Sequence, residues 1–191
     1  MRIGLFFGSF NPVHTGHLII ANFILENSDL ERIWFVVSPH NPLKEKKSLL
    51  NQHDRLHLVR LAIEDNPKFK ASDIEFKLPQ PSYTVDTLAY LSEKNPNHQF
   101  GLIMGSDNLS TINKWKNYEQ LLERYPIYCY QRHGTVESVF HTYPNVQVLN
   151  APMIEISATL IRKMLSEKKS VRYLVPDKVV EYLTGSAYYS R

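Results

Sequence analysis

The chain has 191 residues, of which 43% are hydrophobic and 21% charged, values typical of an ordinary globular protein and not of a disordered one. The 22 basic and 19 acidic residues leave a net charge of +3, too small for the basic stripe of a nucleic-acid-binding protein. One cysteine excludes an internal disulfide framework, and we find neither a signal-peptide pattern nor an apolar run of roughly 18 residues, so we expect a cytoplasmic protein without a membrane segment.

Short apolar runs and longer mixed segments follow each other along the chain. The first half predicts a strand at Arg2–Phe7, a helix at Thr15–Leu25, a strand at Arg32–Val37, a helix at Asn51–Glu64 capped by Asn51, and a strand at Ala71–Phe76. Two prolines and a lysine cluster make Pro39–Leu50 a surface loop. The second half predicts a helix at Thr84–Glu93, a strand at Phe100–Met104, a helix at Trp115–Glu123, strands at Ile127–Tyr130 and Val146–Leu149, and helices at Ser157–Ser166 and Asp177–Leu183.

This alternation predicts the fold class. Short, continuously apolar strands separated by helices are typical of a parallel sheet buried on both faces. We therefore expect a doubly wound α/β fold, with a mostly parallel sheet and helices on both faces, in a single domain over residues 1–191. Cys129 falls within a predicted strand, where a buried structural thiol is the expected role.

The segment Gly8–His17 follows the first predicted strand and opens the first predicted helix. Ligands bind at the carboxyl ends of strands in such sheets, and a helix N-terminus with free N–H groups favours phosphate. Gly8 and Gly16 would let the backbone approach a ligand closely. His14 and His17 are three residues apart, so their imidazoles should be neighbours that donate hydrogen bonds to phosphate, more strongly if protonated.

Other interpretations of the two histidines remain open from spacing alone. They could be polar surface residues of a loop, and a zinc site is disfavoured because no third ligand has suitable spacing. The segment is neither a Walker A loop nor a G-x-G-x-x-G fingerprint, which disfavours P-loop hydrolysis and hydride transfer.

A second candidate element lies near the end of the chain, at Ile156–Arg162. Ser157 is placed to cap a helix, Thr159 adds a second hydroxyl, and Arg162 follows one turn inside. The three side chains could bind phosphate oxygens, with the guanidinium acting as a fork. The alternative is an ordinary helix cap followed by a solvated arginine.

Together the two elements resemble the H-x-G-H nucleotidyltransferase superfamily, in which an I-S-x-T-x-I-R element clamps the β- and γ-phosphates. The resemblance implies that His14, His17 and Arg162 are catalytic. It also implies that ATP contacts Gly8, Ser9, Phe10, Gly16, Ser157 and Thr159. A Mg²⁺ ion would be bound through the ATP phosphates, with no metal ligand from the chain itself.

Three further segments resemble the adenylyltransferases of nicotinate mononucleotide. Pro81–Leu88 is similar to their P-S-Y-T-x-D-T-L segment, and the resemblance implies that Ser82, Tyr83 and Thr84 bind the acceptor, with the Thr84 N–H on the pyridine carboxylate. Gly105–Asp107 resembles their G-x-D element, which implies ATP contacts from Gly105 and Asp107. Trp115 stands where that family has a tryptophan that stacks on the pyridine ring. The partners implied are therefore ATP and nicotinate mononucleotide.

Each of these residues also has a plainer explanation. Ser82 and Asp107 could cap helices, and Trp115 could anchor the core. Two basic residues, Lys44 and Arg132, are candidates for substrate binding, but lysines in such a loop are often only solvated. His40 could line the cleft. His133 departs from the Arg-Pro-Gly pattern that the family shows after this strand.

Two rival functions stay open at this point. One is adenylyl transfer to another acceptor, such as nicotinamide mononucleotide or phosphopantetheine, and Pro81–Leu88 and Trp115 disfavour the latter. The other is a non-catalytic nucleotide-binding protein, which would not need the full set of phosphate-binding side chains. The sequence leaves the oligomeric state open, with a homo-oligomer among the alternatives.

Overall fold

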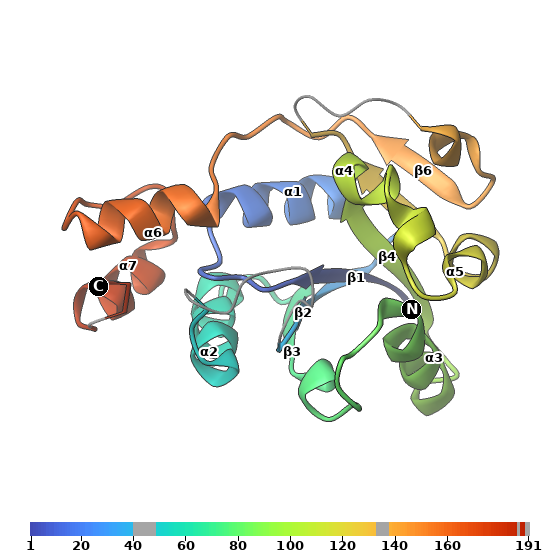
Figure 1. The fold of residues 1–191 in the computed structure, drawn as a ribbon, viewed down its shortest axis with the longest axis horizontal. Coiled ribbons are helices and arrows are strands. Elements are labelled where there is room, and N and C mark those ends of the chain that lie inside the picture. The colour runs from blue at the N-terminus through green and yellow to red at the C-terminus, as the bar shows by residue number, and fades with distance from the viewer. Residues whose placement is uncertain (40–48, 133–137, 187, 190–191) are drawn as a thin grey trace.

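A computed structural model describes residues 1–39, 49–132, 138–186 and 188–189 of the chain. Within them, one sheet of six strands runs in the order β3-β2-β1-β4-β5-β6 (Figure 1). Its strands are β1 (Arg2–Gly8), β2 (Arg32–Val37), β3 (Phe69–Ser72), β4 (Gln99–Gly105), β5 (Ile127–Tyr130) and β6 (Val146–Leu149). All neighbouring pairs are parallel, so the predicted α/β fold is confirmed and the sheet is more uniform than the mostly parallel one expected.

Helices cover both faces of this sheet. The helices α1 (Thr15–Glu26), α2 (Gln52–Ile63), α6 (Ala158–Ser166) and α7 (Asp177–Thr184) share one core cluster with Phe6 of β1. The opposite face holds α3 (Thr84–Lys94), α4 (Ser106–Leu109) and α5 (Tyr118–Arg124), whose apolar side chains pack in clusters that include Leu5 of β1 and Met104 of β4. Successive residues of a strand point to opposite faces, which is why Leu5 and Phe6 serve different clusters.

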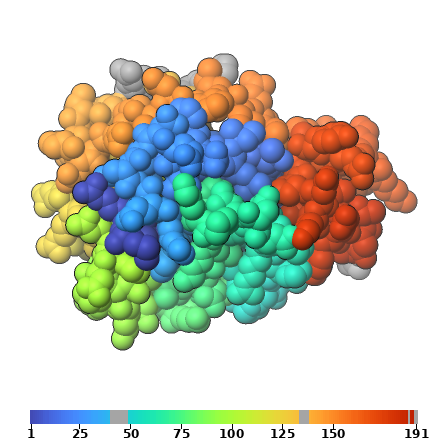
Figure 2. All heavy atoms as spheres, turned by 180° about the vertical axis from the view of Figure 1, so that it is seen from behind, coloured from blue at the N-terminus to red at the C-terminus, as the bar shows by residue number. Residues whose placement is uncertain are grey.

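The C-terminal helices form one end of the molecule, and β6 lies at the other (Figure 1). From behind, the red C-terminal segment packs beside α2 (Figure 2). The ring of Tyr182 in α7 lies 4.7 Å from that of His57 in α2, and Lys178 forms an ion pair with Glu64. No helix in the described part of the chain is long and apolar enough to cross a bilayer.

The strand order places two loops side by side. From β1 the chain moves outward to β2 and β3, then returns to β4 on the other side of β1 and continues to β5 and β6. The carboxyl ends of β1 and β4 therefore flank the point where the order reverses, which is where ligands bind in such sheets. Gly8 and Gly105 end these two strands.

The third strand differs from its prediction. We expected it at Ala71–Phe76, but β3 covers Phe69–Ser72 and Ile74–Phe76 forms a 3-10 helix. The register with β2, in which Phe69 pairs with Ile33 and Ser72 with Val36, sets these bounds. An apolar pattern alone does not reveal that register, because it depends on the partner strand.

The helix predicted at Trp115–Glu123 begins later than expected. Ile112–Lys114 is a 3-10 helix, Trp115 is extended, and Asn117 adopts a left-handed conformation (φ 50°) before α5 starts at Tyr118. Asparagine tolerates this conformation better than most residues, so it can reverse the chain there. The change matters for the site because it frees Trp115 from a helix.

Two smaller predictions are confirmed. The Asn51 side chain caps α2 by accepting a hydrogen bond from the His53 N–H at 2.8 Å. Cys129 is a buried free thiol, and burial raises its pKa to about 12, so the reactive thiolate is scarce at neutral pH.

Candidate active site

A cleft of about 1030 Å³ opens at the carboxyl ends of β1 and β4. Most residues predicted for the site line it: Gly8, Ser9, Phe10, His14, His17, Ser82, Tyr83, Thr84, Asp107, Trp115, Arg132, Ser157, Thr159 and Arg162. Gly16 and Gly105 lie directly behind this lining, while Lys44, His40 and His133 fall outside the described residues. The cleft thus gathers segments from both ends of the chain, and the role of each side chain stays a prediction.

The two histidines are neighbours, as their spacing predicted. Their rings stack with centroids 3.7 Å apart and an interplanar angle of 30°. The backbone N–H of His14 donates to Nδ1 of His17 at 3.2 Å, so the neutral His17 ring carries its proton on Nε2. Phe10, whose side chain is buried, packs edge-on against the His17 ring at 5.1 Å. The Phe10 ring therefore supports the His17 ring from the core side, and the predicted contact of Phe10 with ATP stays a prediction.

Burial keeps His14 neutral. Its side chain is 6% exposed, and burial, followed by the positive charge of Arg132, lowers its pKa to about 4. Its Nδ1 atom has no hydrogen-bond partner among the residues that the structure describes. At pH 7 any hydrogen bond from His14 is therefore that of a neutral imidazole, not of the protonated ring considered from the sequence.

The stability of the fold should depend on this histidine. An unfolded chain protonates His14 near the ordinary pKa of 6.5, whereas the folded chain resists protonation down to about pH 4. Stability is therefore fully present above pH 6.5 and falls as the pH drops toward 4, by about 3 kcal/mol from this group. Urea unfolding of the wild type and His14→Asn across this range measures the effect. Equal losses in both proteins would contradict it.

The start of α1 is more fully bonded than the sequence predicted. The Thr15 N–H donates to the Leu174 carbonyl at 2.9 Å, and the His17 N–H donates to the His14 carbonyl at 2.9 Å. With the His14 N–H also bonded, the expectation of free N–H groups is wrong for these three residues. The start of α1 can therefore attract an anion through the positive end of its helix dipole, not through these bonded N–H groups.

Glycines in this loop make room for side chains. A Cβ atom on Gly16 would lie 3.0 Å from Nδ1 of His14, and one on Gly8 would lie 2.9 Å from the Phe10 ring. Both distances are shorter than ordinary carbon contacts of about 3.5–4 Å. The two glycines therefore allow the His14 and Phe10 rings to lie close to the backbone. This role adds to the predicted one, in which they let a ligand approach the backbone.

Arg162 joins the two candidate elements. One guanidinium nitrogen donates to the Asn11 carbonyl at 2.8 Å, and another donates to Oγ1 of Thr159 at 3.2 Å. Ser157 caps α6 by accepting from the Leu160 N–H at 3.2 Å, which confirms the capping interpretation. The interpretation of Arg162 as a merely solvated arginine is ruled out, because its guanidinium bonds to Asn11 in the Gly8–His17 segment.

Asp107 and Arg132 form a pair at the end of β4. Their side chains lie 3.2 Å apart, and Arg132 also donates its backbone N–H to the Ser106 hydroxyl at 2.9 Å. Gly105 is the N-cap of α4, so Asp107 does not cap it, and a Cβ on Gly105 would collide with the Asp107 carboxylate. We predicted Arg132 as a substrate-binding residue. It lies beside Asp107, and its predicted role in substrate binding stays a prediction.

One wall of the cleft is formed by the start of α3 and by Trp115. The helix starts at Thr84, and Tyr83, its N-cap, supplies no side-chain hydrogen bond. Trp115 is half-buried, packs against both core clusters of this face and also lines the cleft, so the anchoring and stacking interpretations are compatible. The interpretation of Ser82 as the helix cap is wrong, because Tyr83 occupies the N-cap position.

Glu75 was not singled out from the sequence. The residue is 3% exposed, and its carboxylate accepts a hydrogen bond from Oγ1 of Thr87 at 3.1 Å. Burial raises the pKa of Glu75, although the Ser38, Thr87 and Ser82 side chains oppose the shift. Glu75 therefore ties the 3-10 helix after β3 to the first turn of α3. Its one sequence signal is an acid inside the apolar run Ile74–Phe76.

Arg55 was also missed, and it lies fully buried beneath the first loop. Its guanidinium donates to four carbonyls: Leu50 at 2.9 Å, Ser9 at 2.5 Å, Ser38 at 2.8 Å and Pro39 at 2.8 Å. Burial lowers its pKa to about 10, so it stays charged at neutral pH. One side chain thus fixes the loop after β1, the end of β2 and the start of α2 relative to each other.

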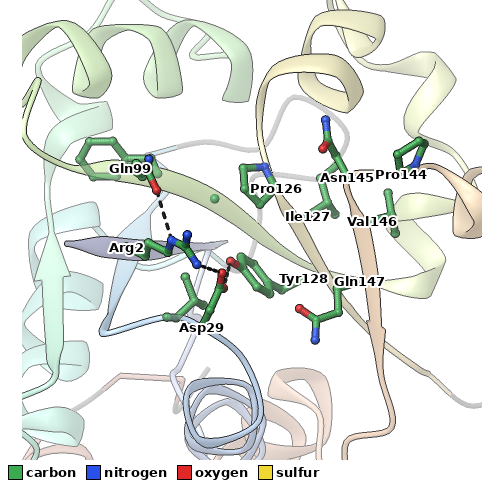
Figure 3. A pocket seen from close by; sticks show the side chains of 13 residues that line it. Arg2, Asp29, Gln99, Pro126, Ile127, Tyr128, Pro144, Asn145, Val146 and Gln147 are labelled. Carbon is green, nitrogen blue, oxygen red and sulfur yellow. Dashed lines mark hydrogen bonds and ion pairs between the residues drawn. The ribbon is translucent and has the colours of Figure 1, made fainter.

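A second cavity of about 280 Å³ lies at the amino ends of the strands (Figure 3). There Arg2 pairs with Asp29 and donates to Gln99 at 3.2 Å, and the Tyr128 hydroxyl donates to Asp29 at 2.5 Å. Because these polar groups already bond to one another, this cavity is a weaker candidate for a ligand site than the cleft. Across the described residues, no group of three His, Cys, Asp or Glu side chains is placed to hold a metal ion.

Comparison with known proteins agrees with this geometry. The cytidylyltransferase-like family matches residues 5–164. A protein from Flavobacterium psychrophilum described as a "probable nicotinate-nucleotide adenylyltransferase" is 53% identical over 193 residues, covering 100% of both chains. A relative of the same description from Cytophaga hutchinsonii is 54% identical, covering 100% of this chain and 99% of the other.

Solved structures show the same fold at lower identity. The nicotinic acid mononucleotide adenylyltransferase of Plasmodium falciparum, complexed with NaAD, superposes with a TM-score of 0.82 at 20% identity, over 99% of this chain and 97% of that one. The same enzyme complexed with APC gives a TM-score of 0.81. The strand order, the contact between the two candidate elements and the full-length relatives lead to one conclusion: this chain belongs to the nicotinate-nucleotide adenylyltransferase family of cytidylyltransferase-like proteins.

Proposed function

We propose that this protein transfers the adenylyl group of ATP to nicotinate mononucleotide, giving nicotinate adenine dinucleotide and pyrophosphate in NAD biosynthesis. The observation that carries the proposal is the bond from Arg162 to the Asn11 carbonyl, which brings the two phosphate-binding elements into one cleft with Trp115 and the start of α3. The family relationship supports the same reaction.

The reaction needs little covalent chemistry from the protein. An oxygen of the acceptor's 5′-phosphate attacks the α-phosphorus of ATP in line. The bond from that phosphorus to the bridging oxygen breaks, and pyrophosphate leaves with the electron pair. Since the second phosphate pKa is about 6, the nucleophile is already an anion at pH 7 and requires no general base. Catalysis then rests on positioning and on stabilisation of developing charge.

The side chains divide these tasks. The Nε2–H of His17 and the guanidinium of Arg162 donate to phosphate oxygens as charge moves to the leaving group, and neutral His14 supports His17 by stacking on it. Ser157 and Thr159 add hydroxyl groups beside Arg162. The first-turn N–H groups of α3 suit the pyridine carboxylate, with Trp115 against the ring.

A Mg²⁺ ion fits this site as part of the ATP complex. Asp107 is paired with Arg132, and the described residues hold no cluster of metal ligands, so the metal would be held through the phosphates. When bound, it would neutralise part of the triphosphate charge. We place the reaction in the cytoplasm, a reducing setting that suits the free thiol of Cys129.

The test is pyrophosphate release from ATP with each acceptor supplied in turn. We expect release with nicotinate mononucleotide, weaker release with nicotinamide mononucleotide, and none with phosphopantetheine. Binding of ATP without pyrophosphate release with any acceptor would favour a non-catalytic nucleotide-binding protein instead.

A further inference from the structure

Lys116 links the two segments that face the acceptor. Its Nζ lies 2.8 Å from Oδ2 of Asp86 in the first turn of α3, and 4.7 Å from the centroid of the Tyr83 ring. Lys116 directly follows Trp115 and lines the cleft. Asp86 lies on α3, thirty positions earlier in the chain. The Lys116 side chain therefore connects two parts of the expected acceptor site. It starts next to Trp115, which is expected to stack on the pyridine ring, and it reaches α3, which is expected to bind the pyridine carboxylate.

The charges of this bridge act on one chemical difference. Nicotinate and nicotinamide mononucleotide have nearly the same shape, but the first carries a carboxylate where the second carries a neutral amide. A positive charge at the wall of the cleft attracts the carboxylate, and a negative charge repels it. Neither charge interacts strongly with the amide. Lys116 and Asp86 thus have opposite effects on the preference for acid over amide.

Resting on the function proposed above, we propose that the Lys116–Asp86 pair sets the preference of this enzyme between the acid and amide forms of its acceptor. Lys116 raises the preference for the carboxylate, and Asp86 lowers it by offsetting the lysine charge. The Tyr83 ring holds the ammonium group at the cleft through a cation–π contact, so Lys116 keeps its place when Asp86 is made neutral.

The simplest alternative is that this ion pair only stabilises the fold. The side chains of Lys116 and Asp86 are 43% and 52% exposed, and such pairs contribute little to stability. In that case both substitutions would act alike on the two acceptors. The ratio of kcat/KM for the acid to kcat/KM for the amide separates the two explanations, because effects on folding and on ATP cancel in it.

The experiment measures this ratio for the wild type, Lys116→Met, Asp86→Asn and the double variant. We expect Lys116→Met to lower it about fivefold and Asp86→Asn to raise it about threefold, the scale of one partly exposed charge. Both shifts should shrink in high salt, since the Debye length falls from about 10 Å at 0.1 M to about 3 Å at 1 M.

Lys94→Met is the matched control. Lys94 makes the same kind of contact, 5.8 Å above the ring of Tyr90 on α3, but lies outside the cleft, so the ratio should not change. Ratios that stay at the wild-type value in both Lys116→Met and Asp86→Asn, or that shift in the same direction in both, would overturn the inference while leaving the function intact. A wild type that releases pyrophosphate with neither acceptor would refute the proposed function itself, and this inference with it.

Discussion

Replacing His17 by alanine should lower kcat about 100-fold while changing the affinity for ATP much less. His17 presents Nε2–H to the cleft because its Nδ1 accepts the backbone N–H of His14. A donor fixed in this way is already oriented before charge develops on the phosphates, and losing one such donor costs on the order of 100-fold in turnover. The ground-state triphosphate keeps Arg162 and the hydroxyls beside it, so binding should survive.

The measurement is steady-state pyrophosphate release together with the equilibrium affinity for ATP. His57→Ala is the control, because His57 is an exposed histidine on α2 that lies outside the cleft and packs against Tyr182. It should keep wild-type turnover. If purified, folded His17→Ala turned over within threefold of the wild type, His17 would not be a transition-state donor.

Much of this site follows from local sequence. The stacking of His14 and His17 follows from their spacing at a helix start, and the cap at Ser157 from its position before an apolar run. The parallel sheet follows from continuous apolar strands, and its order brings the ends of β1 and β4 together. Local patterns thus place the backbone of the cleft and the side chains carried on its helix starts.

What sequence could not supply are contacts between distant segments. The bond from Arg162 to Asn11 and the ion pair Lys116–Asp86 depend on how distant loops meet in space, and the hydrophobic pattern of the sequence does not predict such contacts. The same limit explains β3, whose bounds are set by its register with β2. The buried position of Arg55, in contrast, could have been predicted from the sequence. It falls on the apolar stripe of α2 with Leu58, Val59 and Ala62, and an arginine in such a stripe must find partners inside.

Arg55→Met is therefore expected to destabilise the fold by about 4 kcal/mol. The methionine would fill most of the volume but would leave the carbonyls of Leu50, Ser9, Ser38 and Pro39 without their donor. Each unpaired buried polar group costs about 1–3 kcal/mol, and partial access of water to the loop reduces the sum. A loss of this size is a large fraction of the roughly 5–15 kcal/mol that stabilises a typical domain.

Two companion variants separate charge from geometry. Arg55→Lys keeps the positive charge but cannot reach three separate segments with one ammonium group, so it should recover only part of the stability. Arg60→Met removes an exposed arginine of the same helix and should change the unfolding midpoint little. Urea unfolding of the four proteins measures the series. Because Arg55 holds Ser9 in the first loop, the lysine variant should also bind ATP more weakly than the wild type at temperatures where both are folded. Equal stability of Arg55→Met and Arg60→Met would mean that the four carbonyls find other donors, and that the first loop keeps its shape without this buried guanidinium.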